Sequence, residues 1–242
     1  MKSANNIGIT GSATRTIAFW AKANVVGQES MVTLGRTCAG NDEFGAIIYN
    51  GDWFLNGCSA GNDYDTGVAA DTKWHSHVIT YDGLHAHWYL DGKEIGSGYT
   101  HTFATVDQEL YIGIRPPISS DFFFNGIIDD VRVYNRALSV SEVQQLYHLG
   151  TANAGHSNAI ISNGLVGYWP FDGSATNWSN NTTRDMSGSG NTGFITSSVL
   201  GTTSAPTGGV IGQAFNFPAS ASTWGVNALN SSSLAITRPD NY

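Results

Sequence analysis

The stretch "GIIDDVRVYNRALSVSEVQQLY", residues 126–147, reads as a strand, a turn and a short helix. Its first half is mostly apolar and is bounded by Gly and Asn, as strands commonly are. Ser139 and Glu142 then form a capping box, and Gly150 ends the apolar stripe of the helix. A strand followed by such a helix is typical of the end of a domain, yet the chain continues to residue 242.

Strand-like segments recur on both sides of this stretch. The turns "NGD" (50–52), "YDG" (81–83) and "LDGK" (90–93) place glycine where a hairpin needs a positive φ. The sequence therefore predicts an all-β fold of antiparallel strands with one short helix. Strands are predicted over 15–23, 30–36, 43–50, 52–57, 74–82, 86–96, 109–115 and 126–135, and again within 164–173, 191–200 and 211–218.

The composition agrees with a β-rich globular protein. Hydrophobic residues make up 41% of the chain and charged residues only 12%, and 29 glycines indicate many turns. The formal net charge of −8 repels phosphate backbones, and no Lys/Arg cluster offsets it. We therefore expect no nucleic-acid partner, whereas the acidic loops remain available to cations.

Nothing in the sequence indicates insertion into a membrane. No apolar run approaches the roughly 20 residues that cross a bilayer, and residues 1–20 lack the charged-then-apolar pattern of a signal peptide. Cys38 and Cys58 are the only cysteines and flank a predicted hairpin. They form either one disulfide or two buried free thiols.

The motifs "TIAFWAK", "WHSHVITYDG", "HWYLDGKEIG" and "NGIIDDVRVYNRALSVSEVQQLY" resemble the C-terminal two thirds of a laminin-G-like domain of the concanavalin A type. "GLVGYWPFDG", "DMSGSGNTG" and "GGVIGQAFNF" resemble the first third of the same domain. The resemblance implies a jelly-roll β-sandwich. It also implies an extracellular or cell-surface protein, so we expect any leader to lie outside this sequence.

The order of these motifs is rotated. Residues 1–150 hold the later part of the domain, 151–163 a small, polar linker, and 164–242 the opening third. Residues 164–242 then fold back onto the same chain, or they complete a neighbouring chain in a head-to-tail assembly. The stretches "SANNIGITGSATRTIAFW" and "SSSLAITRPDNY" both resemble the segment that precedes the "TIAFW" strand.

We find no constellation of catalytic residues. Glucanases of this fold carry paired carboxylates at alternate positions of one strand, and the chain has no Glu-x-Asp-x-x-Glu pattern. Asp107 and Glu109 alternate but lack a third member. We therefore expect a protein that is not an enzyme.

A structural calcium is the cofactor that the resemblance implies. Its ligands would be Asp172, Asp185, Asn191 and Asp129, which come from both parts of the rotated chain. Oxygen donors of this kind suit Ca²⁺, although the same side chains can simply cap turns or pair with an arginine. A second cation is possible at the acidic loops that contain Asp42, Asp63 and Asp65. Zinc binding by His75, His77, His85 and His87 depends on the register of their hairpin.

Four aromatic residues in turns or polar loops are candidates for stacking on sugar rings: Trp53, Tyr64, Trp178 and Trp224. They would equally serve as lids folded over the core. The resulting hypothesis is a non-catalytic, extracellular lectin-like adhesion module that binds a glycan or a cell-surface protein. The alternative is a structural subunit whose partner is itself, assembled by exchange of residues 164–242.

Overall fold

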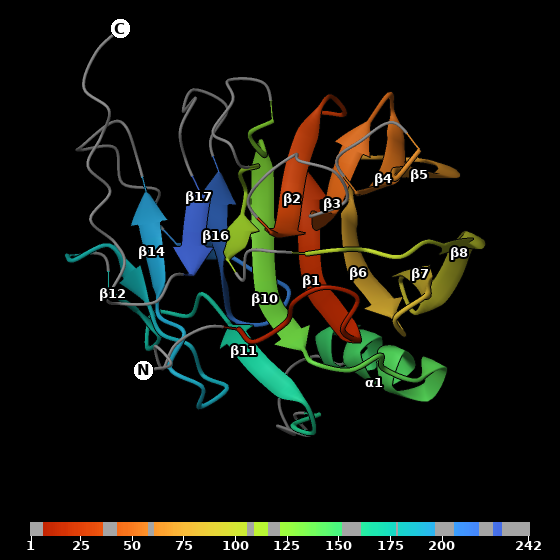
Figure 1. Cartoon of the computed structure of the whole chain (residues 1–242). Helices are drawn as coiled ribbons and strands as arrows, with labels where there is room; N and C mark the ends of the chain where they lie inside the picture. The colour runs from red at the N-terminus through yellow and green to blue at the C-terminus, as the bar shows by residue number, and fades with distance from the viewer. Residues whose placement is uncertain are drawn as a thin grey trace, which may run out of the picture.

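A computed structural model of the chain describes residues 7–35, 43–57, 61–105, 109–115, 122–151, 161–177, 179–196, 206–217 and 225–228. These residues form two antiparallel sheets that pack face to face around a hydrophobic core (Figure 1). The predicted jelly-roll β-sandwich with one short helix is confirmed.

One sheet has eight strands. Their order is β15-β16-β10-β1-β6-β7-β8, and β11 also pairs with β10. The strands are β1 (Arg15–Ala23), β6 (Trp74–Tyr81), β7 (His85–Leu90), β8 (Lys93–Thr100), β10 (Gly126–Tyr134), β11 (Leu165–Trp169), β15 (Thr207–Gly208) and β16 (Gln213–Phe217).

The other sheet has nine strands in the order β12-β13-β14-β17-β9-β2-β3-β4-β5. These strands are β2 (Glu29–Leu34), β3 (Phe44–Tyr49), β4 (Asp52–Asn56), β5 (Tyr64–Ala69), β9 (Leu110–Ile112), β12 (Thr176–Asn177), β13 (Thr182–Thr183), β14 (Gly193–Thr196) and β17 (Gly225–Ala228). The sequence predicts no strand at β5, whose first residues were assigned to the acidic loop with Asp63 and Asp65, because polar residues mask a strand at the edge of the sheet.

Alternation along the strands sets which side chains enter the core. On β1, Ile17, Phe19 and Ala21 are buried between the sheets, and Ile17 lies opposite Ile79 of β6. Because side chains of a strand alternate between faces, this register places one apolar set inside. The long central strands β1, β6 and β10 therefore anchor the sandwich.

Strands from residue 164 onward complete both sheets within the same chain. Both β11 and β16 pair with β10, and β17 pairs with β9. In Figure 1 these later strands, coloured cyan to blue, lie beside β10 at the opposite side of the molecule from β8. The two groups of rotated motifs thus meet across β10.

Helix α1 (Val140–Thr151) covers part of the outer face of the eight-stranded sheet. Its residues Val143 and Leu146 pack on Ala18 and Val78. The predicted capping box forms, since the Ser139 N–H donates to Glu142 Oε2 at 2.9 Å. Among the described residues, no helix is long and apolar enough to cross a membrane.

Candidate functional site

Asp129 and Asp172 both accept hydrogen bonds from the backbone of the turn that leads into β16. Asp129 Oδ2 accepts hydrogen bonds from the backbone N–H of Val210 at 2.8 Å and Ile211 at 2.9 Å. Asp172 Oδ1 accepts one from Gln213 N–H at 2.8 Å. This acidic pair, Asp129 and Asp172, therefore fixes the start of β16 against β10.

The acidic pair lies in an environment that disfavours negative charge. Asp129 is fully buried, and its Oδ1 has no hydrogen-bond partner among the described residues. Burial, together with the nearby Asp130 and Asp172 carboxylates, raises the pKa of Asp129 to about 8, although the N–H groups of Ile211 and Val210 oppose the rise. An unpartnered, buried carboxylate oxygen beside a second carboxylate fits a hard cation.

The other two predicted calcium ligands hold a different loop. Asp185 accepts hydrogen bonds from the N–H groups of Tyr168, Ser187 and Asn191 at 2.8 to 2.9 Å. Asn191 Nδ2 donates to Val166 O at 2.8 Å, while its buried Oδ1 is unpartnered within the described part of the chain. In that part of the chain, no three His, Cys, Asp or Glu side chains form a metal-binding group.

The second acidic loop pair also makes backbone contacts. Asp63 Oδ1 accepts from Gly57 N–H at 2.9 Å, and Asp65 Oδ1 accepts from Gly67 N–H at 2.8 Å. Asp42 lies outside the described residues, as do Cys38 and Cys58 of the predicted disulfide. The described carboxylates here therefore serve as caps of turns.

The four histidines divide between different environments. His77 is fully buried and stacks on Phe19, with ring centroids 5.0 Å apart. His85 and His87 instead pair separately with Asp82 and Glu94, at 3.1 and 2.6 Å. The register thus does not bring the four imidazoles together for zinc.

Trp53 does not lie in an exposed turn, and that expectation was wrong. Its side chain is 2% exposed and packs in the main core, with its ring 4.7 Å from His77. The turn is made by Asn50 and Gly51, both with positive φ, so Trp53 already belongs to β4 and points inward. Trp178 and Trp224 lie outside the described residues.

Tyr64 is half-buried at the edge of the sandwich where β5 approaches β8. Its ring stacks on Tyr99, with centroids 5.2 Å apart and planes 12° apart, and Tyr99 stacks on His101 at 5.2 Å and 14°. Ser97 N–H donates to the Tyr64 hydroxyl at 2.7 Å. We call Tyr64, Ser97, Tyr99 and His101 the edge site.

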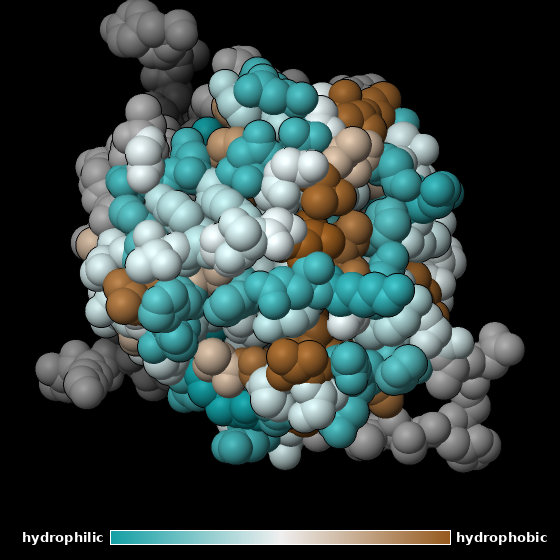
Figure 2. Space-filling view, turned by 90° about the vertical axis from the view of Figure 1, so that its right-hand side faces the viewer, coloured by the Kyte–Doolittle hydropathy of each residue, from teal (hydrophilic) through white to brown (hydrophobic). Residues whose placement is uncertain are grey.

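The surface around the edge site combines apolar and polar side chains. Figure 2 faces this edge and shows a band of apolar side chains between polar ones. Val68 and Ile95 contribute partly buried apolar surface beside the tyrosines. Asp63 lies close enough to Tyr99 to raise the pKa of its phenol, in addition to the rise caused by burial. The edge therefore offers aromatic rings next to carboxylate and hydroxyl groups.

Sequence reasoning missed the partners of Tyr64. Tyr99 lies within the glycine-rich stretch "IGSGYT" (95–100) and His101 follows it, and the alternation there is too weak to predict aromatic residues on one face. Gly96 has a φ of +69°, and a Cβ there would collide with the Tyr64 hydroxyl. A small residue next to Ser97 is thus needed for the Tyr64 contact.

A second aromatic cluster, the sheet-face site, lies on the nine-stranded sheet. Phe122 stacks on Tyr49 at 6.4 Å, and the Arg115 guanidinium lies 4.8 Å from the Phe122 ring. Arg115 Nε donates to Glu43 Oε2 at 3.1 Å, and Asn56 Nδ2 donates to the same oxygen. The charges of Arg115 and Glu43 in the sheet-face site are therefore paired with each other.

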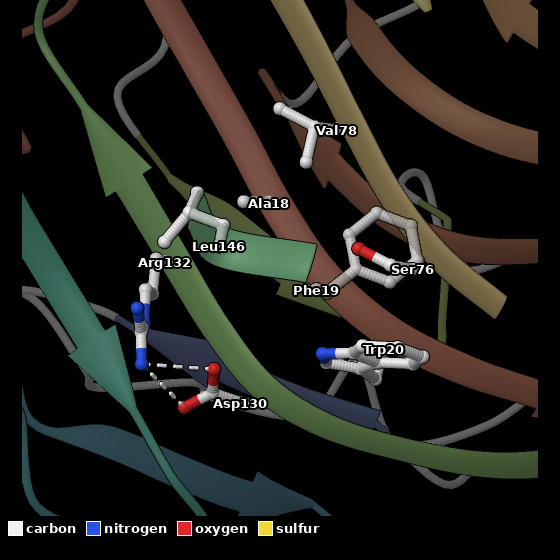
Figure 3. A pocket seen from close by; sticks show the side chains of 8 residues that line it. All are labelled: Ala18, Phe19, Trp20, Ser76, Val78, Asp130, Arg132 and Leu146. Carbon is white, nitrogen blue, oxygen red and sulfur yellow. Dashed lines mark hydrogen bonds and ion pairs between the residues drawn. The ribbon is translucent and has the colours of Figure 1, made fainter. Parts of the chain in front are cut away.

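A small pocket lies between β1, β6, β10 and α1 (Figure 3). The buried Asp130–Arg132 ion pair, at 3.0 Å, forms one wall, and Trp20 forms the opposite wall. Asp130 has a φ of +55°, because β10 carries a bulge between Asp129 and Arg132 opposite β1. The space holds about one water molecule, which is too small for a sugar ring.

A family model described as "Concanavalin A-like lectin/glucanases superfamily" matches residues 2–144. The match covers more than half of the chain, including β1 to β10 and the start of α1. A search of curated proteins gives no significant match.

Solved structures share the fold at low sequence identity. A Bacteroides ovatus protein described as a "putative carbohydrate binding protein" is 19% identical with a TM-score of 0.59, over 78% of this chain and 54% of that one. Domain 4 of an extracellular GH43 arabinanase from Geobacillus stearothermophilus, in complex with arabinotriose, is 18% identical with a TM-score of 0.46, over 59% and 70%. The chain thus spans about half the length of the first structure.

Proposed function

Because the chain belongs to the concanavalin A-like lectin and glucanase superfamily, we propose that it is a non-catalytic, extracellular module that binds a glycan. The edge site is the observation that carries this proposal. Its stacked tyrosines are half-buried next to the half-buried Asp63 carboxylate and the exposed Ser97, so an apolar face and hydrogen-bonding groups occur together. Sugar rings require this combination, because one face of the ring is apolar and its rim is hydroxylated.

The edge site is held rigidly before any ligand arrives. The Tyr64 hydroxyl accepts from Ser97 N–H at 2.7 Å, and the Tyr99 hydroxyl donates to Gly61 O at 3.0 Å. Both rings are therefore fixed at their outer ends as well as by stacking. A fixed ring loses little conformational entropy on binding, which favours affinity from a small contact area.

The test is binding to a panel of soluble and insoluble polysaccharides by pull-down and calorimetry. We expect Tyr99→Ala to weaken binding at least about tenfold, as loss of an aromatic contact does, and Tyr99→Phe to retain most of it because the ring remains. Tyr49→Ala in the sheet-face site is the matched control. Binding lost only with Tyr49→Ala would move the site to the sheet face, and no binding to any glycan would contradict the proposal.

The proposal excludes glycoside hydrolysis. The sequence carries no triplet of carboxylates on one strand of the kind that glucanases of this fold use. Incubation of the protein with each bound oligosaccharide, followed by chromatography of the products, tests this point. Release of shorter oligosaccharides at a rate that rises with protein concentration would contradict a purely binding role.

We further propose that the acidic pair holds a structural calcium. Calcium would offset both the burial and the carboxylate repulsion that raise the pKa of Asp129, and it would bind the unpartnered Asp129 Oδ1. The melting temperature should rise with calcium and fall with chelator. The Asp129→Asn variant should lose this response, whereas Asp65→Asn in the second acidic loop should keep it. An unchanged melting temperature of the wild type would rule out the calcium site.

Self-assembly by exchange of residues 164–242 remains the second candidate function. The pairings of β11 and β16 with β10 can form between two chains as well as within one. Light scattering over a dilution series decides between them. A mass near 25.8 kDa at every concentration supports the binding module, and larger, concentration-dependent species would support assembly.

A further inference from the structure

The edge site has a fixed carboxylate beside its aromatic rings. Asp63 directly precedes Tyr64 in the chain, and its Oδ1 accepts a hydrogen bond from Gly57 N–H at 2.9 Å. The same loop reaches the outer end of the second ring, because Gly61 O accepts from the Tyr99 hydroxyl at 3.0 Å. Burial and the charge of Asp63 together raise the pKa of the Tyr99 phenol. The Asp63 carboxylate is therefore close to the stacked rings and is held in place.

No lysine or arginine on the strands of this edge offsets the carboxylate. Residues 61–70 and 95–103, which include β5 and most of β8, contain two aspartates and neither of the two basic residue types. His101 is the third ring of the stack, and burial lowers its pKa, so its imidazole is neutral at pH 7. Lys93 begins β8 and is separated from Tyr99 by about 20 Å of extended strand. The edge site therefore presents negative charge to a ligand.

Arg15 does not change this charge at the surface. It is separated from the stack by Tyr81 and Phe103, since the Phe103 ring lies 5.1 Å from that of Tyr81 and 6.3 Å from that of Tyr99. Its guanidinium is fully buried, lies 5.3 Å from the Tyr81 ring and donates to backbone carbonyls and to Thr105 Oγ1. Arg15 is thus out of reach of an anionic group on a ligand.

An uncharged sugar suits these surroundings. Its hydroxyl groups donate hydrogen bonds to a carboxylate, and its apolar face stacks on an aromatic ring. Val68 and Ile95 add partly buried apolar surface on the same two strands, and Val68 is roughly 13 Å along β5 from Tyr64. This surface is longer than one sugar ring, which favours a glycan chain over a single sugar.

An acidic sugar would face repulsion at the same place. Its carboxylate or sulfate group would approach Asp63 with no lysine or arginine of this edge to pair with. Like charges a few ångströms apart at a protein surface weaken binding by about tenfold or more. One carboxylate therefore both accepts from hydroxyl groups and excludes anions, and such exclusion is a common source of specificity.

We propose that the edge site binds uncharged glycan chains and rejects chains that carry carboxylate or sulfate groups on the bound sugars. Asp63 is the residue that determines this specificity. The inference rests on the proposed glycan binding at the edge site and adds the class of glycan.

Pairs of polysaccharides that share a backbone and differ in charge test the proposal on the full chain. The pairs are hydroxyethyl and carboxymethyl cellulose, methyl-esterified and de-esterified polygalacturonate, and dextran and dextran sulfate. Dissociation constants are measured with calcium held constant, at about 20 mM and about 500 mM NaCl. We expect the uncharged member to bind at least about tenfold more tightly at low salt. The difference should shrink at high salt, because salt screens exposed charges.

Two variants connect this preference to one residue. Asp63→Asn should reduce the preference to less than about threefold, because the amide is uncharged while its Oδ1 still accepts from Gly57 N–H. Glu94→Gln is the matched control, since it removes the same charge from the first part of β8, where Glu94 pairs with His87 at 2.6 Å. It should keep the wild-type preference. Circular dichroism establishes that both variants are folded.

The outcomes separate this specificity from glycan binding itself. Equal affinity for both members of a pair, or tighter binding of the anionic member, would contradict the specificity and leave glycan binding in place. A preference that Asp63→Asn keeps, or that Glu94→Gln also loses, would show that Asp63 does not determine it. Binding to none of the six polymers would overturn the proposal, and the glycan-binding function with it if the wider panel of polysaccharides also gives no binding.

Discussion

At the residue scale, His77 is a titratable side chain in the centre of the sandwich. Its ring is fully buried between Phe19 and Trp53, and neither ring nitrogen has a hydrogen-bond partner among the described residues. Burial lowers the pKa of His77 well below 6.5. The unfolded chain therefore binds a proton near pH 6.5 that the folded protein does not, and stability is lost as the pH falls below this value.

Replacing His77 with leucine should remove this acid sensitivity. Relative to His77→Leu, the wild type should lose about 2 kcal/mol of unfolding free energy between pH 7 and pH 5. Urea unfolding at a series of pH values measures the difference. Ile79→Val on the same strand is the control, because it should cost about 1 kcal/mol at every pH. If the unfolding free energies of the wild type and His77→Leu change with pH in the same way, His77 does not cause the loss of stability in acid.

Glu29 should lower the stability as the pH rises, whereas His77 lowers it as the pH falls. Its side chain is 4% exposed, and burial raises its pKa to about 7, although the Asn125 N–H at 3.3 Å opposes the rise. The folded protein then binds a proton that the unfolded chain has lost, so stability falls as the pH rises from about 4.5 through 7. Glu29→Gln should nearly match the wild type at pH 4.5 and exceed it by about 3 kcal/mol at pH 8. Equal stability at pH 8 would contradict a raised pKa of Glu29 in the folded protein.

At the element scale, the turn before β16 depends on a close approach between glycine and aspartate. A Cβ at Gly209 would collide with the Asp129 carboxylate, whereas one at Gly208 would meet nothing within 4 Å. Gly209→Ala should therefore lower the unfolding free energy by at least ~1 kcal/mol, and Gly208→Ala should leave it nearly unchanged. Denaturant melts of the two neighbouring variants provide the comparison. Equal effects would show that Asp129 does not fix this turn.

Some of the strands and the helix could be predicted from the sequence, and others could not. Periodic apolar residues and hairpin glycines located the long strands, and Ser139 with Glu142 located the start of α1. Strand β5 was missed because an edge strand needs no apolar alternation. Trp53 was taken for a turn residue although it belongs to the strand predicted over 52–57, and in β4 it points into the core.

The pairing of distant residues lay beyond sequence reasoning for a physical reason. The stacking of Tyr64 on Tyr99 depends on how the edges of the two sheets approach each other, and no local pattern records that distance. From the sequence, Asp129 and Asp172 could be predicted only as two of four calcium ligands, and not as a pair. The structure shows that Asp129 and Asp172 share one turn, while Asp185 holds another loop.

At the scale of the whole molecule, the fold depends on which strands pair with each other more than on the order in which they follow along the chain. The central strand β10 is paired by β1 from the early part of the chain and by β11 and β16 from the later part. Chain connectivity can therefore be changed while every pairing is kept, because domain termini and exposed linkers tolerate rearrangement.

A rearranged chain tests this view of the whole molecule. It starts at Ile161, runs to Ala228, continues through a flexible linker of about ten residues to Ile7, and ends at Thr151. We expect it to be monomeric, to keep the far-ultraviolet circular dichroism of the original, and to melt within about 5 °C of it, because every described strand and α1 is retained. A matched control opened within β10, between Ile128 and Asp129, should fail to melt cooperatively. If the first protein also fails, or folds only as a dimer, the strands after residue 164 pair with β10 of a neighbouring chain instead of their own.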